Sequence, residues 1–419
     1  MDIGWKLRRL VHLTRRIGGS VAVRGWRATL RRALRGRTDI RERSDETYGP
    51  VVVAPPSGDR PRRRLLVIDT MTPDPNRDSG SMRLCQIFSL LNADGWTIDF
   101  IADDDDASPR DVHRLAAIGV NVHRGRPRSW LTENGASVDA IMLCRLPIAD
   151  QYIDMARRLA PRARTVFDTV DLHFVREQRG AELTGNARLA RQAARSQRRE
   201  LAMVTRADVT LVVSAGEQAI LAREAPRSSV YVVSNIHDIV GSSAAFSSRS
   251  GLLFVGGFGH PPNEDAVRWF AGDVLPLLRA RDAGILLHVV GDIDDDSRRS
   301  LERDGIVVHG RVADLSPLLG QARLSVAPLR FGAGVKGKVN QAMSHGLPVV
   351  LTSIAAEGMY IRNGVDALVA DDPDSMAIAI WRAYQDEALW LRLSEGGLEN
   401  VRDHFSAERA RDALRAALG

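Results

Sequence analysis

The sequence alternates between short apolar runs and longer segments of helical spacing, in two separate series. The first series begins near residue 64 and contains the runs LLVIDTM, TIDFIAD, VNVHR, DAIMLCR, RTVFDTV, DVTLVVS and SVYVVSN. The second contains LLFVGGF, ILLHVVG, IVVHGRV, LSVAPL, LPVVLTS and DALVAD. Continuous apolar strands separated by helices are typical of parallel sheets covered on both faces. The sequence therefore predicts two doubly wound, Rossmann-like α/β domains.

The length of 419 residues suits two to three domains, and composition shifts suggest where they divide. The expected parts are a basic helical arm with a proline-rich linker (1–60), an N-terminal domain (61–240), a small-residue linker (241–250), a C-terminal domain (251–396) and a last helix that packs back on the N-terminal domain (397–419). Two such domains predict a cleft between them. Ligands of this fold sit beyond the carboxyl ends of the strands.

The first 43 residues carry thirteen Lys or Arg against three acidic residues, with Trp5 and Trp26 at helical spacing among them. Such an arm can lie on an anionic membrane surface. A solvated basic helix is an equally open alternative. Nucleic acid is disfavoured, because a stacking aromatic platform is missing and the rest of the chain is not basic.

The sequence contains neither an apolar run long enough to span a membrane nor a secretion signal. Its two cysteines, Cys85 and Cys144, lie far apart inside apolar runs, as expected of reduced core thiols. These features predict a cytoplasmic protein, with peripheral contact at the inner face of the membrane as an open alternative.

A glycine-rich turn, RFGAGVKGKV, follows one strand of the second series and leads into a helix. The free N–H groups and the dipole of a helix N-terminus favour an anion, and Lys336 and Lys338 add two point charges. The P-loop pattern GxxxxGK[ST] is absent, which disfavours a kinase or NTPase. A phosphate or diphosphate is expected here, and a tight turn with solvated lysines is the alternative. The backbone candidates are Gly332, Gly334, Val335 and Gly337.

A second turn of the same kind, PDPNRDSGSMR, follows the first strand of the N-terminal domain. It offers Ser79, Gly80 and Ser81 as backbone donors at the start of a helix. Two facing turns from two domains could hold one diphosphate between them.

The acidic residues of the chain give no clear metal site. The runs Asp103–Asp106 and Gly291–Arg299 look like solvated loops, because an EF-hand counted from Asp292 would have Arg303 in place of its last glutamate. Asp168 and Asp171 flank His173, and either could act as a base in an inverting reaction. The favoured interpretation is that they cap the following segment and orient the histidine.

Five ordered motifs together resemble the retaining glycosyltransferases of the GT-B fold, family 4: DSGSMR, FDTVDLHFVREQR, VSNIHD, FVGGFGHPPNEDAV and FGAGVKGKVNQAMSHGLPVVLTSIAAEGM. The resemblance extends from about Arg64 to the C-terminus. It implies transfer of a sugar from a nucleotide diphosphate to a saccharide or lipid-linked hydroxyl acceptor, with retention at the anomeric carbon and without a metal or other cofactor. The usual setting of the family is polysaccharide or glycolipid assembly.

The resemblance also implies roles for individual residues. His173 corresponds to the sugar-facing histidine. The family's diphosphate contacts in the C-terminal domain fall on the turn of Lys336 and Lys338, which could supply the cations that assist departure of the diphosphate. The family's glycine-rich loop falls on Ser79–Ser81. The contacts to the nucleotide base fall on Gly310, Arg311 and Val312, and the contact to the ribose falls on Gln341. Glu357 and Asp171 are further candidates for the donor sugar.

This chain departs from the family pattern at three places. Gln341 stands where a glutamate usually holds the ribose, Ala333 replaces an acidic residue, and His260 and Asn263 lie where an Arg/Lys pair is usual. A glutamine loses a charge-assisted hydrogen bond worth about 1.5–3 kcal/mol. A nucleotide-sugar epimerase, an inverting transferase and a weakened nucleotide-binding scaffold therefore remain alternatives.

Overall fold

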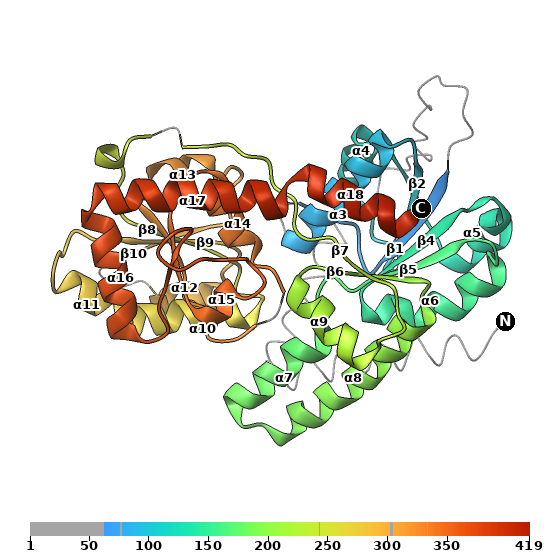
Figure 1. Cartoon of the computed structure of the whole chain (residues 1–419), viewed down its shortest axis with the longest axis horizontal. Helices are drawn as coiled ribbons and strands as arrows, with labels where there is room; N and C mark the ends of the chain where they lie inside the picture. Colours follow the sequence, from blue (N-terminus) through green and yellow to red (C-terminus); the bar gives the residue numbers. More distant parts are fainter. Residues whose placement is uncertain (1–62, 76–77, 243, 302–304, 333) are drawn as a thin grey trace.

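The computed structural model describes residues 63–75, 78–242, 244–301, 305–332 and 334–419 (Figure 1). The basic arm expected over residues 1–60 and Ala333 lie outside these residues. The described chain forms two α/β domains, each built on one parallel sheet. This architecture confirms the fold class expected from the two series of apolar runs.

The N-terminal domain holds a seven-stranded sheet in the order β3-β2-β1-β4-β5-β6-β7, with all neighbours parallel. Its strands are β1 (Arg64–Asp69), β2 (Thr97–Ala102), β3 (Val120–His123), β4 (Ala140–Cys144), β5 (Arg164–Asp168), β6 (Val209–Val212) and β7 (Val230–Val232). Its helices are α3 (Ser79–Ala93), α4 (Pro109–Ala117), α5 (Pro127–Asn134), α6 (Leu146–Leu159), α7 (His173–Thr184), α8 (Ala187–Arg206) and α9 (Ala215–Glu224). β4 is buried along its whole length and β1 and β5 from their second residue on, because helices cover both faces.

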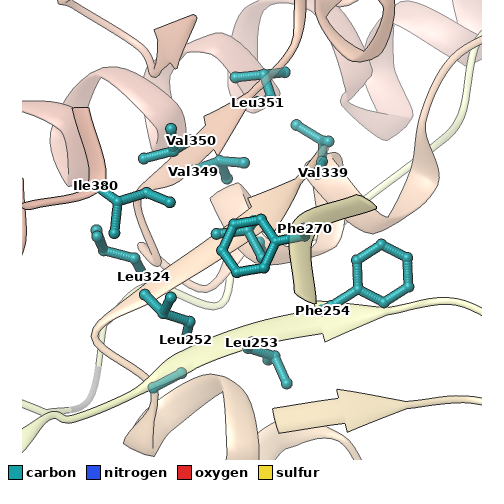
Figure 2. Close-up of a cluster of buried hydrophobic side chains, with 14 of the residues drawn as sticks. Leu252, Leu253, Phe254, Phe270, Leu324, Val339, Val349, Val350, Leu351 and Ile380 are labelled. Atoms are coloured by element: carbon teal, nitrogen blue, oxygen red, sulfur yellow. The ribbon is translucent and has the colours of Figure 1, made fainter. Parts of the chain in front are cut away.

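The C-terminal domain holds a six-stranded parallel sheet in the order β10-β9-β8-β11-β12-β13. Its strands are β8 (Leu252–Val255), β9 (Leu287–Val290), β10 (Ile306–Gly310), β11 (Leu324–Ala327), β12 (Val349–Leu351) and β13 (Leu368–Val369). Its helices are α10 (Pro261–Trp269), α11 (Leu275–Arg279), α12 (Asp295–Leu301), α13 (Ser316–Gln321), α14 (Gly337–Ser344), α15 (Ser353–Ala356), α16 (Pro373–Gln385) and α17 (Glu387–Phe405). Figure 2 shows Phe254 of β8, Val350 of β12 and Ile380 of α16 in its core.

The chain crosses between the domains twice. It first crosses after β7, and it returns at Ser406, where α17 ends and α18 (Ala407–Leu418) begins (Figure 1). The domain boundary that the sequence suggested at residue 396 falls inside α17. Ala410, Leu414 and Ala417 of α18 are buried in the core of the N-terminal domain, so this last helix ties the two domains together.

A helical hairpin of α7 and α8 projects from the N-terminal domain (Figure 1). It interrupts the alternation of strands and helices between β5 and β6. Its first residue is His173, four residues of loop beyond the end of β5 at Asp168, so the hairpin starts at the edge of the sheet where ligands of this fold bind. Within the described residues, no helix combines the length and the apolar character that a bilayer crossing requires.

Candidate functional site

The two domains touch where the carboxyl ends of their strands meet. A Cβ atom added to Gly337, the first residue of α14, would lie 2.6 Å from Cβ of Ser79, the first residue of α3. Nearby, a Cβ on Gly334 would lie 3.4 Å from Cβ of Asp171. The first turns of two helices from two domains therefore abut, and both glycine-rich turns belong to one site.

The N-terminus of α3 is already partly occupied by a carboxylate of its own. Asp78 is the N-cap, and its side chain accepts hydrogen bonds from the Ser81 N–H at 2.8 Å and from the Ser81 hydroxyl at 3.0 Å. Within the described part of the chain, the N–H groups of Ser79 and Gly80 have no acceptor. Of the three expected backbone donors, two are thus free to meet a ligand.

Gly80 is tightly enclosed. A Cβ there would lie 2.9 Å from Val170, a β-branched residue with φ of +64°. Arg145, at the end of β4, has φ of +75° and ψ of 147°, a region that glycine favours. Its Nε donates to Asp69 at 3.0 Å, and its Nη2 lies 3.4 Å from the position of a Cβ on Gly80. Such backbone strain is tolerated where the surroundings fix a functional geometry.

The two lysines of the turn are packed against protein rather than solvated. Lys336 is buried, and its ammonium group donates to the carbonyl of Gly334. Lys338 is partly buried, donates to the side chain of Asn263, and lies 4.5 Å from the centre of the Phe254 ring. Burial lowers the pKa of Lys336 to about 8, and burial together with Lys336 lowers that of Lys338 to about 7. A bound anion would favour the charged form of both.

His173 lies at the N-terminus of α7 beside a buried carboxylate that sequence reasoning missed. Glu200, on α8, accepts the backbone N–H groups of His173 at 3.2 Å and Phe174 at 3.1 Å. The His173 Nδ1 atom lies 3.4 Å from Glu200 Oε1. The expectation that Asp168 and Asp171 cap this segment is therefore wrong, because a carboxylate from the next helix takes that position.

The two aspartates that flank His173 are held by arginines. Asp168 is buried and accepts a hydrogen bond from Arg83 of α3 at 2.8 Å. Asp171 forms an ion pair with Arg176. Burial raises the pKa of Asp171, but nearby guanidinium groups, Arg176 foremost and also Arg145, outweigh it and leave the pKa below its usual value. Asp171 is therefore a weak base for proton abstraction.

A second buried carboxylate also escaped sequence reasoning. Glu217 of α9 accepts the N–H groups of Leu172 at 3.1 Å and Val213 at 3.2 Å. Burial and the nearby charge of Asp171 raise its pKa to about 7. The sequence signal was Ser214 three residues before Glu217, the spacing of a capping box.

Glu357, expected near the donor sugar, forms an ion pair with Arg179 of the N-terminal domain. Both of its carboxylate oxygens accept hydrogen bonds from Arg179 of α7, which also donates to the carbonyl of Gly332 at 2.7 Å. Just beyond it, a Cβ on Gly358 would lie 2.8 Å from Cβ of Ser214. The loop that carries Glu357 is thus part of the contact between the domains.

The residues expected to bind the base and ribose lie on two elements of the C-terminal domain. Gly310 ends β10 with φ of +70°, and Arg311 pairs at 3.2 Å with Asp74, in the loop before α3. Val312 follows them. Gln341 lies one turn into α14, half-buried, and its side chain has no hydrogen bond within the described residues. Its amide is therefore available to a ligand.

The described residues contain no group of three or more His, Cys, Asp or Glu side chains placed to share a metal ion. In the acidic run from Gly291, Asp294 accepts the N–H of Ser297 at 3.0 Å. In the run Asp103–Asp106, Asp103 accepts hydrogen bonds from Gln151 and Tyr152.

Comparisons with known sequences agree with this geometry. Residues 249–386 match the family model described as Glycosyl transferases group 1, which covers the C-terminal domain. A protein described as an uncharacterized 44.6 kDa protein in the cps region of Klebsiella pneumoniae is 27% identical over 130 residues. That match spans 29% of this chain and 34% of the Klebsiella protein.

Solved structures resemble the chain over most of its length. Sucrose-phosphate synthase from Thermosynechococcus elongatus matches with a TM-score of 0.65 and 18% sequence identity. The match covers 85% of this chain and 98% of the synthase chain. HepE of Anabaena, solved with UDP and glucose, matches with a TM-score of 0.64 and 15% sequence identity. The match covers 85% of this chain and 99% of the HepE chain. The chain therefore has the GT-B fold.

Proposed function

We propose that this chain, with a GT-B fold and a C-terminal domain that matches the Glycosyl transferases group 1 family, moves a sugar from a nucleotide diphosphate to a hydroxyl acceptor with retention at the anomeric carbon. The observation that carries the proposal is the contact of Gly337 with Ser79, beside Lys336 and Lys338. This arrangement gathers two helix N-termini and two ammonium groups at one point, as recognition of a diphosphate requires. The structure of HepE with UDP and glucose supports a sugar nucleotide as the donor.

In this scheme, charge that develops on the leaving diphosphate is stabilised by Lys336, Lys338 and the dipole of α14. The leaving diphosphate oxygen accepts the proton of the acceptor hydroxyl on the same face of the sugar. The bond from the anomeric carbon to the diphosphate breaks as the bond to the acceptor oxygen forms. The scheme uses no metal ion or cofactor, and His173 contacts the sugar.

The proposed setting is the cytoplasmic assembly of a polysaccharide or glycolipid, with a saccharide or lipid-linked acceptor. A lipid-linked acceptor would suit a basic arm over residues 1–43 at the membrane surface. A direct check is to add vesicles of anionic lipid to the full chain and measure co-sedimentation at low and high salt, because surface attraction of this kind is screened by salt.

The central test replaces each lysine by alanine and by arginine. Lys336→Ala and Lys338→Ala should each lower turnover by about 10²–10³-fold, the usual cost of one lost group that stabilises transition-state charge. Lys336→Arg keeps the charge but not the compact ammonium, so it should recover only part of the loss. Near wild-type transfer in both alanine variants would refute the assignment. The donor for these assays is first identified by a thermal-shift screen of nucleotide sugars, because a specific ligand raises the unfolding temperature.

Three alternatives give different results in the same assays. Inversion at the anomeric carbon, seen by NMR of the product, would indicate an inverting transferase, and turnover without any acceptor would indicate an epimerase. Gln341 in the place of a usual glutamate favours a weakened binder. Nucleotide diphosphate affinity without transfer from any donor would support that candidate.

A further inference from the structure

We propose that Glu200 is a positioning residue that fixes His173 as the tautomer with a proton on Nδ1, so that Nε2 is presented to substrate as a hydrogen-bond acceptor. The identity of that substrate group, a sugar hydroxyl, rests on the proposed function. The tautomer itself rests only on the contacts of Glu200.

The carboxylate of Glu200 is fully buried, with 0% of the residue exposed. Its polar neighbours are the two N–H groups at the start of α7 and the Nδ1 atom of His173, and no ion pair with Arg or Lys is found for it in the described part of the chain. A buried carboxylate is stable only when hydrogen-bond donors surround it. Donors at the end of a helix meet this need, and the helix dipole adds to it.

The same contacts decide which ring nitrogen carries the proton. His173 Nδ1 is buried and lies 3.4 Å from Glu200 Oε1, a charge contact, and it makes no hydrogen bond within the described residues. An ionised carboxylate only accepts hydrogen bonds, so a bare Nδ1 would place two lone pairs against each other. A proton on Nδ1 removes this repulsion. The neutral imidazole then has its lone pair on Nε2.

The position of His173 allows Nε2 to be used. The side chain keeps 19% of its surface exposed, while Nδ1 is buried, so the exposed part belongs to the rest of the ring. His173 begins α7 after a short loop that follows β5, and Asp171, in that loop, approaches Gly334 of the phosphate-binding turn. An acceptor nitrogen at this edge suits the hydroxyl group of a sugar, which needs an acceptor for its proton.

A cap for α7 alone would not require this arrangement. Local caps come from Ser, Thr, Asp or Asn at the N-cap position, whereas α7 has Leu172 there, without a side-chain cap. The acceptor comes instead from α8, 27 residues further along the chain. The α7–α8 hairpin therefore has an identifiable task, because it carries a carboxylate back to the histidine.

The test is to determine the tautomer of His173 in the full-length protein from the ¹⁵N chemical shifts of its two ring nitrogens. The variant His173→Gln, which lacks the ring, assigns the signal. The wild-type ring should show a protonated Nδ1 and a bare Nε2. In Glu200→Gln, the new amide can turn its NH₂ group toward Nδ1, which should shift the ring toward a proton on Nε2. The matched control, Glu182→Gln at an exposed glutamate of α7, should leave the signal unchanged.

Transfer assays then connect the tautomer to catalysis. Glu200→Gln should lower kcat at least tenfold, with nucleotide diphosphate affinity within twofold of wild type. The double variant with His173→Ala should be no slower than His173→Ala alone, because Glu200 acts through the histidine. A wild-type ring with the proton on Nε2, or an unchanged ring in Glu200→Gln, overturns the inference. The expected ring shifts without any sugar transfer support the inference and refute the proposed function.

Discussion

The contact between Gly337 and Ser79 predicts that a single methyl group will separate the domains. The Gly337 backbone is not among the positive-φ positions, so alanine can adopt it, and its smaller freedom in the unfolded chain should contribute about 0.4–1 kcal/mol of stability. The new Cβ, however, would lie 2.6 Å from Ser79 Cβ and 3.4 Å from Asn235 Nδ2. Carbon atoms prefer about 3.5–4.0 Å, so the domains must move apart by about 1 Å.

A displacement of that size should be costly for a site that both domains build. A misplacement of about 1 Å can lower turnover by about 100-fold, which corresponds to about 2.7 kcal/mol of activation free energy. We therefore expect Gly337→Ala to retain or raise its unfolding temperature while kcat for sugar transfer falls about 100-fold. The assay is steady-state transfer at saturating donor, together with thermal unfolding monitored by circular dichroism.

Two further variants separate the steric cause from other effects. Gly180→Ala in α7 makes the same change of residue where nothing lies within 4 Å of the new Cβ, so it should leave kcat unchanged. Ser79→Gly combined with Gly337→Ala removes the Cβ at 2.6 Å but keeps the backbone donor, so it should recover much of the lost activity. Wild-type kcat in Gly337→Ala alone would refute the reasoning.

Four other predictions concern charges in the site. Since Lys336 and Lys338 have pKa values of about 8 and 7, calorimetric affinity for a nucleotide diphosphate should weaken as the pH rises through this range; equal affinity at pH 6 and 9 would contradict their role. Because both pKa values are depressed in the folded protein, the unfolded chain binds more protons than the folded one between about pH 7 and 10.5. The free energy of unfolding, measured with denaturant, should therefore rise with pH in that window. This contribution should be lost when both lysines are replaced by methionine. Gln341→Glu should tighten nucleotide binding about tenfold by adding a charge-assisted hydrogen bond to ribose, and weaker binding would argue against that contact. In a double-mutant cycle, Arg179→Ala and Glu357→Ala should show a coupling of about 0.2–1 kcal/mol in the free energy of unfolding. The coupling is small because the Glu357 side chain is exposed. Additive effects would show that this ion pair does not stabilise the contact between the domains.

The sequence predicted the fold because the strands are buried on both faces. Val349–Leu351 are 0% exposed, and a run of this kind has no polar position to obscure the pattern. The segment AVRWFAGDVLPLLRAR, residues 266–281, has the apolar spacing of one helix but does not form a single regular helix. The structure divides it into α10, a π-helical segment (Phe270–Val274) and α11, because Pro276 cannot donate the hydrogen bond of a regular turn.

The site was harder to predict than the fold. The turns at Ser79 and Gly337 could be recognised because each is local in sequence and follows an apolar strand. The carboxylate of Glu200 could not, since a glutamate within an arginine-rich helix looks like a solvated residue until the hairpin folds back. The contact of Glu200 joins segments 27 residues apart, which local spacing does not reveal. The hydrogen bond from the Ser81 N–H to Asp78, in contrast, is a local N-cap that an aspartate before a helix predicts.

The burial of the two lysines also makes them chemically distinct. The sequence contains only Lys6, Lys336 and Lys338, and all its other basic side chains outside histidine are arginines. Acylating reagents attack the uncharged amine, and at neutral pH an ordinary lysine is almost entirely charged. Lys338 and Lys336, in contrast, would have a substantial uncharged fraction. Among the lysine side chains, slow labelling by an amine-directed reagent near neutral pH should therefore mark this turn, as read by peptide mass spectrometry, and a nucleotide bound there should protect it.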